Sequence, residues 1–147
     1  MAIKVSTGLR NGALSTGSIK SLMDGGKIKI YSGPVPATAD AAIGSATLLC
    51  TVSLDATATG VNFDTAAANG VLSKDPAQVW SGVNSNTGTP TWYRHVTSAD
   101  DGTESTTAYR IQGTVGVAGA DLNLSNNTLT AGATQTIDYY SIAWPTL

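Results

Sequence analysis

The feature that most constrains the fold of this chain is a change in its hydrophobic period at Gly26. Before that point the apolar residues recur every three to five positions, and they follow serine or threonine residues able to cap a helix: Ser6, Thr7, Thr16 and Ser18. After it, "KIKIYSG" (residues 27–33) alternates isoleucine with lysine or tyrosine, which is the period of a half-buried strand. The sequence therefore predicts an N-terminal arm with short helical turns over residues 1–26, followed by β-structure.

The rest of the chain consists of short strand candidates separated by turn residues. They are "TLLCTVSL" (47–54), "QVWSGV" (78–83), "TWYRHVTS" (91–98), "TTAYRIQGTVGV" (106–117), "DLNLSN" (121–126) and "TQTIDYYSIAW" (134–144). Asn69-Gly70 is a hairpin signal before Val71. Because no helical stretch lies between the candidates, we expect antiparallel sheets. For residues 27–147 we predict an all-β fold, an antiparallel β-sandwich or jelly roll.

Charge is scarce in this chain and is unevenly distributed. Only 12% of the residues are charged, against about 25% in an average soluble protein, which favours a surface partly covered by neighbouring subunits. Residues 1–30 carry a net charge of +4 and the remainder −6. The cations of the first segment are either a solvated surface or a docking site for an acidic protein: Lys4, Arg10, Lys20, Lys27 and Lys29. They are too scattered, and the pI of 5.0 is too low, to predict nucleic-acid binding.

Neither the cysteine content nor the hydropathy pattern indicates export or membrane insertion. Cys50 is the single cysteine and lies in the apolar run "ATLLCTVSL", so we expect a buried thiol and no internal disulfide. The N-terminus lacks the apolar core of a signal peptide, and no apolar run approaches ~20 residues. We therefore expect synthesis in the cytoplasm and no association with a membrane.

The residues that could support catalysis or metal binding are few. His95 is the only histidine, and strand alternation directs it away from Arg94, so we expect it to pack rather than to catalyse. Asp100 and Asp101 precede Gly102 without the ligand spacing of a calcium loop, and we expect them to form a turn. The chain contains no nucleotide-binding motif or nucleophile elbow. The sequence predicts no enzyme, cofactor or metal site.

Most of the aromatic residues fall on the predicted strands, where core packing is the commonest role. In "DYYSIAW" alternation places Tyr139 with Ile137 on one face, and Tyr140 and Trp144 on the other. Large side chains on both faces indicate a strand that is covered on both faces or that lies at a subunit contact. We therefore expect five aromatic residues in the core or at a subunit contact: Trp80, Trp92, Tyr139, Tyr140 and Trp144.

Three segments of the chain resemble small virion proteins encoded near the capsid genes of tailed bacteriophages. They are "MAIKVSTGLRNGALSTGSIKSLMDGGKIKIYSG", "PVPATADAAIGSATLLCTVSL" and "RIQGTVGVAGADLNLSNNTL". The resemblance covers nearly the whole chain. It lies in the overall residue pattern and in short sequences such as "GLRN" and "GADLNLS". It implies a capsid decoration, or cement, protein: a small β-domain that assembles as a dimer or trimer outside an HK97-like head and clamps neighbouring copies of the major capsid protein.

Three other functions remain open from the sequence. A tail or head-to-tail component would share the composition and the virion location. A carbohydrate-binding β-sandwich would use the same aromatic residues as an exposed platform. A small hydrolase would need His95 beside a carboxylate in a pocket. If the chain is a decoration protein, we expect it on the capsid surface after synthesis in the bacterial host.

Overall fold

The computed structural model describes residues 3–144 of the 147. The chain begins with a short edge strand and two helices: β1 (Lys4–Val5), α1 (Thr7–Ser15) and α2 (Ile19–Met23). Ser6 caps α1 by accepting a hydrogen bond from the amide of Leu9, and Ser18 caps α2 in the same way through the amide of Ser21. The predicted helical turns and two of the predicted caps are confirmed. In the part of the chain that is described, no helix is long and apolar enough to cross a membrane.

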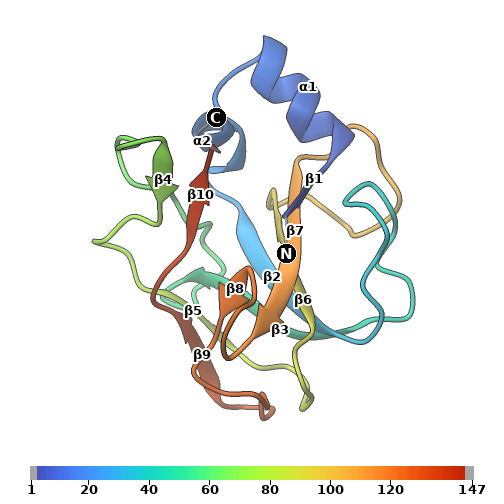
Figure 1. Ribbon diagram of the computed structural model, residues 1–147. Coiled ribbons are helices and arrows are strands. Elements are labelled where there is room, and N and C mark those ends of the chain that lie inside the picture. Colours follow the sequence, from blue (N-terminus) through green and yellow to red (C-terminus); the bar gives the residue numbers. More distant parts are fainter. Residues whose placement is uncertain (1–2, 145–147) are drawn as a thin grey trace.

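Strands make up most of the regular structure of the described residues (Figure 1). After β1 they are β2 (Lys27–Ser32), β3 (Thr47–Leu54), β4 (Val71–Ser73), β5 (Trp80–Val83), β6 (Trp92–Val96), β7 (Arg110–Gly116), β8 (Leu122–Asn123), β9 (Thr134–Ile137) and β10 (Ser141–Ala143). The large sheet has the order β1-β7-β6-β2-β3-β5-β9, and β4 and β10 form a separate two-stranded ribbon. The all-β, mainly antiparallel, sandwich-like class predicted from the sequence is confirmed.

Two strand predictions need correction. The pair β7–β8 is parallel although we expected only antiparallel pairing. This short pairing follows the turn at residues 117–121, where the Asp121 carboxylate accepts hydrogen bonds from the backbone and hydroxyl of Thr114 at 2.8 and 2.9 Å. The segment 134–144 is two strands in different sheets, because the chain leaves the large sheet after Ile137. Tyr139 therefore does not share a face with Ile137: the tyrosine is exposed and the isoleucine is buried.

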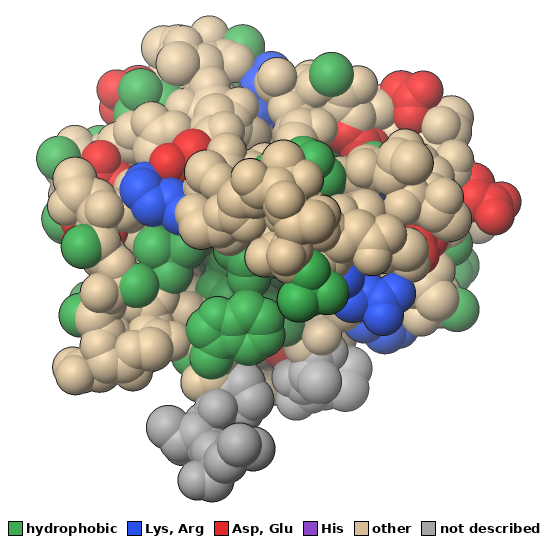
Figure 2. Space-filling model, turned by 90° about the horizontal axis from the view of Figure 1, so that it is seen from above, with side chains coloured by type: hydrophobic (Ala, Val, Ile, Leu, Met, Phe, Trp, Pro, Cys, Tyr) green, Lys and Arg blue, Asp and Glu red, His purple; other side chains and the backbone are tan. Residues whose placement is uncertain are grey.

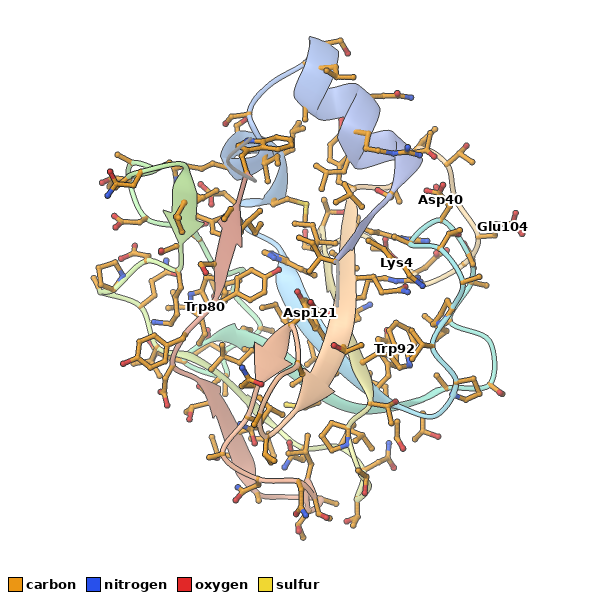
Figure 3. The ribbon with its side chains drawn as sticks, viewed as in Figure 1. Lys4, Asp40, Trp80, Trp92, Glu104 and Asp121 are labelled. Carbon is orange, nitrogen blue, oxygen red and sulfur yellow. The ribbon has the colours of Figure 1, made fainter. Side chains whose placement is uncertain are left out.

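The two faces of the large sheet carry different kinds of side chain. One face packs into the apolar core, which includes Ile28, Ile30 and Tyr93. On the other face Trp92 stacks on Tyr31 with ring centroids 4.3 Å apart, beneath the loops of residues 33–46 and 97–109. Figure 3 shows Trp80 and Trp92 well separated on the two sides of the molecule. The alternation predicted for β6 is therefore confirmed.

The N-terminal segment is part of the domain, contrary to its description as an arm. β1 pairs with β7 at the edge of the large sheet. Leu9 and Met23 are fully buried members of the core. Gly26 marks the change from helix to strand, but the two sides of that change share one core. Deletion of residues 2–20 would therefore remove part of the core and an edge strand, and we expect it to destabilise the whole domain.

Candidate functional site

His95 lies in an aromatic cage in the core. Its ring centroid is 5.5 Å from those of Phe63 and Tyr140 and 6.3 Å from that of Trp80. Neither ring nitrogen makes a hydrogen bond of normal geometry within residues 3–144, although the Met23 backbone lies near enough to favour the protonated ring. Burial lowers the pKa of His95 to about 4, despite the opposing influence of the Asp24 charge. The ring is therefore neutral at pH 7 and is closed off from any substrate.

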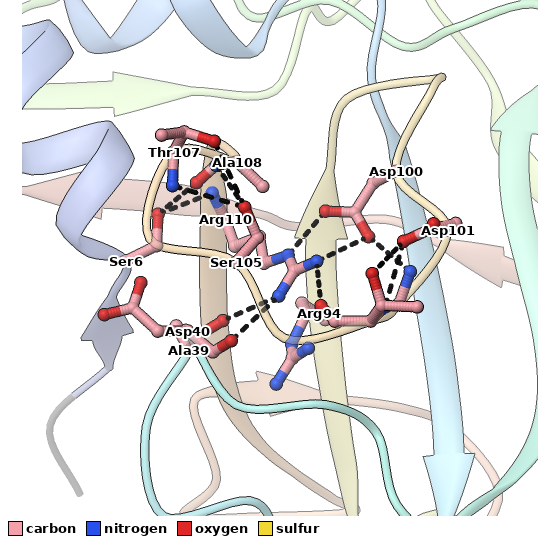
Figure 4. Close-up of polar contacts among 12 residues, drawn as sticks. Ser6, Ala39, Asp40, Arg94, Asp100, Asp101, Ser105, Thr107, Ala108 and Arg110 are labelled. Carbon is pink, nitrogen blue, oxygen red and sulfur yellow. Dashed lines mark hydrogen bonds and ion pairs between the residues drawn. The ribbon is translucent and has the colours of Figure 1, made fainter.

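Two buried arginines, Arg94 and Arg110, form a polar cluster on the loop-covered face of the sheet (Figure 4). Arg110 on β7 pairs with Asp100, and both side chains are only 1% exposed. Arg110 also donates to the Thr103 carbonyl at 2.7 Å. Arg94 on β6 donates to the Gln112 side chain and, at 3.0 Å, to the Ala41 carbonyl.

This cluster holds two loops on the sheet. Backbone carbonyls of loop 33–46 accept hydrogen bonds from Arg94, Arg110 and Gln112. Loop 97–109 supplies Asp100 and Thr103 as acceptors for Arg110. Burial lowers the pKa of Arg94 to about 10, and the nearby charge of Arg110 acts in the same direction. Since the guanidinium groups of Arg94 and Arg110 donate their hydrogen bonds to groups of the fold itself, we assign the cluster a structural role.

The acidic loop after β6 takes part in this structure. The Asp100 carboxylate accepts from the Gly102 amide at 2.8 Å as well as from Arg110. The exposed Asp101 accepts from the amide and the hydroxyl of Thr103, which lowers the pKa of its carboxyl. The predicted turn is confirmed. Over residues 3–144, no three His, Cys, Asp or Glu side chains are grouped so as to hold a metal ion.

An apolar groove of about 630 Å³ lies open on the surface of the described residues. Its walls come from β1, α1, the start of α2 and β10. They are formed by Ile3, Val5, Leu9, Arg10, Ala13, Leu14, Ile19, Ile142, Ala143 and Trp144. A second hollow continues past Ile19 and Ile142 to Leu72 and Lys20. Figure 2 shows hydrophobic side chains gathered around a hollow on this face, with basic side chains on either side.

Two side chains in this apolar groove are unusually exposed for their type. Leu14 is 87% exposed and Trp144 is 73% exposed. Exposed large apolar residues that gather in one place mark a binding surface more reliably than ones scattered singly. The apolar groove is therefore our candidate functional site.

The apolar groove is also bordered by unpaired strand edges. The Ser6 amide donates to the Arg110 carbonyl, so alternation turns the backbone groups of Val5 away from β7. On β10, the Tyr140 carbonyl and the Trp144 amide form hydrogen bonds on the side that faces β4. Alternation therefore turns the backbone groups of Ser141 and Ala143 away from β4. Among the described strands, β1 pairs only with β7 and β10 only with β4, so the outward backbone groups of Val5, Ser141 and Ala143 face no strand partner.

The structure does not bring the five predicted docking cations together. Lys20 pairs with Asp24 at 2.7 Å, and Lys29 donates to the Asp100 carbonyl at 3.0 Å. Lys27 lies beside Lys29 on β2 and is half-buried. Lys4 is exposed on β1 and reaches the Pro36 carbonyl at 3.4 Å. Arg10 is the only one of the five that lines the apolar groove, and Lys20 lines the hollow beside it.

The predicted aromatic residues fall into two groups. Trp80 and Tyr140 are buried in the apolar core, whereas Trp92 is buried on the loop-covered face of the sheet. Trp144 borders the apolar groove, whereas Tyr139 is 91% exposed outside it. The two exposed rings do not form a shared platform.

Sequence reasoning missed the apolar groove because its parts are far apart in the chain. It also missed the Arg110–Asp100 pair, although an arginine within a predicted buried strand is a signal that a partner is needed. Cys50 is buried as expected, and burial raises the pKa of its thiol to about 11. Comparisons of this chain with protein-family models, with curated proteins and with solved structures find no match.

Proposed function

We propose that this protein is a structural component of a tailed-phage virion. In this role it decorates the outside of the head and stabilises contacts between copies of the major capsid protein. The observation that carries the proposal is the exposed apolar groove, which has the character of a protein-binding surface. A dimer or trimer of the chain would bring several such surfaces to one capsid.

Further support comes from the composition and from the way the polar residues are used. With 12% charged residues the chain has little charge to cover its surface. The buried arginines stabilise loops, and His95 lies in the core out of reach of solvent. Decoration needs no reaction chemistry, because many modest contacts repeated over a shell add up to a large barrier against its opening.

The test is to mix the purified protein with empty phage heads assembled without it, and then to sediment the heads. We expect binding that saturates at a fixed number of copies per head and raises the temperature at which the heads open. Failure to sediment with heads would contradict the proposal. In that case the tail or head-to-tail role is tested next, by locating the protein in intact virions.

A further inference from the structure

We propose that the apolar groove binds an extended segment of the partner protein, which adds as a strand between β1 and β10. This inference deepens the proposed function and rests on it for the identity of the partner, the major capsid protein. It names the binding site, the backbone conformation of the bound segment and its side-chain chemistry.

The first argument is the position of the strand edges. Ile3 and Val5 of one edge and Ile142 and Ala143 of the other line the same apolar groove. An unpaired edge is a template for a further strand, and a strand that enters here has two edges available to it. Val5 is available on one side, and Ser141 and Ala143 on the other.

The second argument is the chemistry of the lining. A strand places alternate side chains on opposite faces, so one set of the bound segment's side chains meets the groove floor formed by Leu9, Ala13 and Ile19. These side chains should be apolar. Arg10 is the only charged residue in the lining, and it keeps exposed donors beyond its 2.9 Å bond to the Thr7 hydroxyl. The segment that complements this surface is apolar at alternate positions and carries a carboxylate near Arg10.

A second copy of this chain is a poorer occupant. Over residues 3–144, every strand is already paired along at least one edge with another strand of its own chain. The other edge of the large sheet, β9, buries Gln135 and Ile137. A strand of a neighbouring copy is held by its own sheet and cannot enter between β1 and β10 without leaving it, so we assign the segment to the partner.

The experiment measures amide hydrogen exchange in the protein, free and bound to heads assembled without it. We expect peptides from β1 and β10 to exchange at least about tenfold more slowly on the heads, because incoming carbonyls bond to their outward amides. Peptides from β9 serve as the internal control and should not change. Bound protein without protection at β1 and β10 would overturn the inference while leaving the proposed function intact. Absence of binding to heads would overturn both.

Two further outcomes identify a different occupant and would also overturn the inference. If β1 and β10 become protected without heads as the protein concentration rises, the occupant is a second copy. If the free protein is already protected there, and a variant ending at Trp144 loses that protection, the chain's own last residues occupy the site.

A pair of surface variants tests the groove independently of exchange. Leu14→Glu places a charge in the apolar groove at a residue that is 87% exposed, so the fold is retained. We expect its affinity for heads to fall about tenfold or more. Val117→Glu is the matched control, since Val117 is 56% exposed and lies outside the apolar groove. Wild-type affinity in Leu14→Glu, or an equal loss in both variants, would contradict groove binding.

Discussion

At the scale of single residues, the core accommodates buried polar side chains in two ways. Arg110 is paired with Asp100 and donates to backbone carbonyls of the loops that cover it. His95 instead lies among the rings of Phe63, Trp80 and Tyr140, where the neutral form is favoured. Protonation of this histidine therefore opposes folding.

The first prediction is that His95 makes the protein less stable at acid pH. Its pKa is 6.5 in an unfolded chain and about 4 in the folded protein, so the unfolded state binds the proton more readily. The contribution of the neutral His95 to the free energy of unfolding is complete above pH 6.5, and it is lost progressively as the pH is lowered towards 4. The loss is about 3 kcal/mol over this range. Urea unfolding at several pH values measures it.

The matched variant for this prediction is His95→Leu. It has no proton to gain, so the difference in unfolding free energy between wild type and variant should change by that amount between pH 6.5 and 4. A constant difference would show that the histidine does not titrate in this way. Taking the difference removes the contribution of the carboxylates, which are common to both proteins.

At the scale of elements, α1 packs unusually close to the rest of the domain. Gly8 and Gly12 are both buried on its inner face. A methyl group added at Gly8 would collide with the backbone of Thr107 and Ala108. Helix propensity alone favours alanine over glycine, so at this position packing and propensity have opposite effects.

We predict that packing decides the outcome at Gly8. Gly8→Ala should destabilise the protein by about 1–3 kcal/mol, because the backbone of loop 97–109 must shift to admit the methyl group. The exposed Asn11 on the same helix gives the control, and Asn11→Ala should be neutral or stabilising by up to about 0.7 kcal/mol. Denaturant unfolding of the two variants measures both effects. A stabilised Gly8→Ala would mean that α1 is not packed against this loop.

At the scale of the whole molecule, one core joins the N-terminal segment to the strands. Leu9 contributes to the same core cluster as Ile111 of β7 and Tyr140 near the other end of the chain. The surface of this combined body, and not a separate arm, presents the apolar groove. The basic character of residues 1–30 therefore belongs to the folded domain.

The last prediction compares two leucines of α1. Leu9→Ala should cost about 2–5 kcal/mol of unfolding free energy, because it leaves a cavity in the core. Leu14→Ala should stay within about 0.5 kcal/mol of wild type, since that side chain is exposed. Thermal or denaturant unfolding measures both. Equal, small effects would show that the N-terminal segment is not part of the cooperative fold.

The sequence by itself determined the class and most of the elements of this protein. The strand predicted at residues 47–54 matches β3, and Ser6 and Ser18 cap the helices as expected. Asn69 and Gly70 both take positive φ in the predicted hairpin turn before β4. These features depend on near neighbours in the chain, so period and turn chemistry are sufficient to predict them.

Only the tertiary structure decided which distant segments meet. The apolar groove joins Ile3 to Trp144, and the buried Arg110 donates to the Ala39 carbonyl of loop 33–46. The separation of β9 from β10 also depends on tertiary contacts. The alternating residue pattern continues through residues 134–144, although the chain changes from one sheet to the other within them. The physical reason is that such contacts depend on the packing of the whole core, whereas the period of a segment reports only whether its own residues are buried.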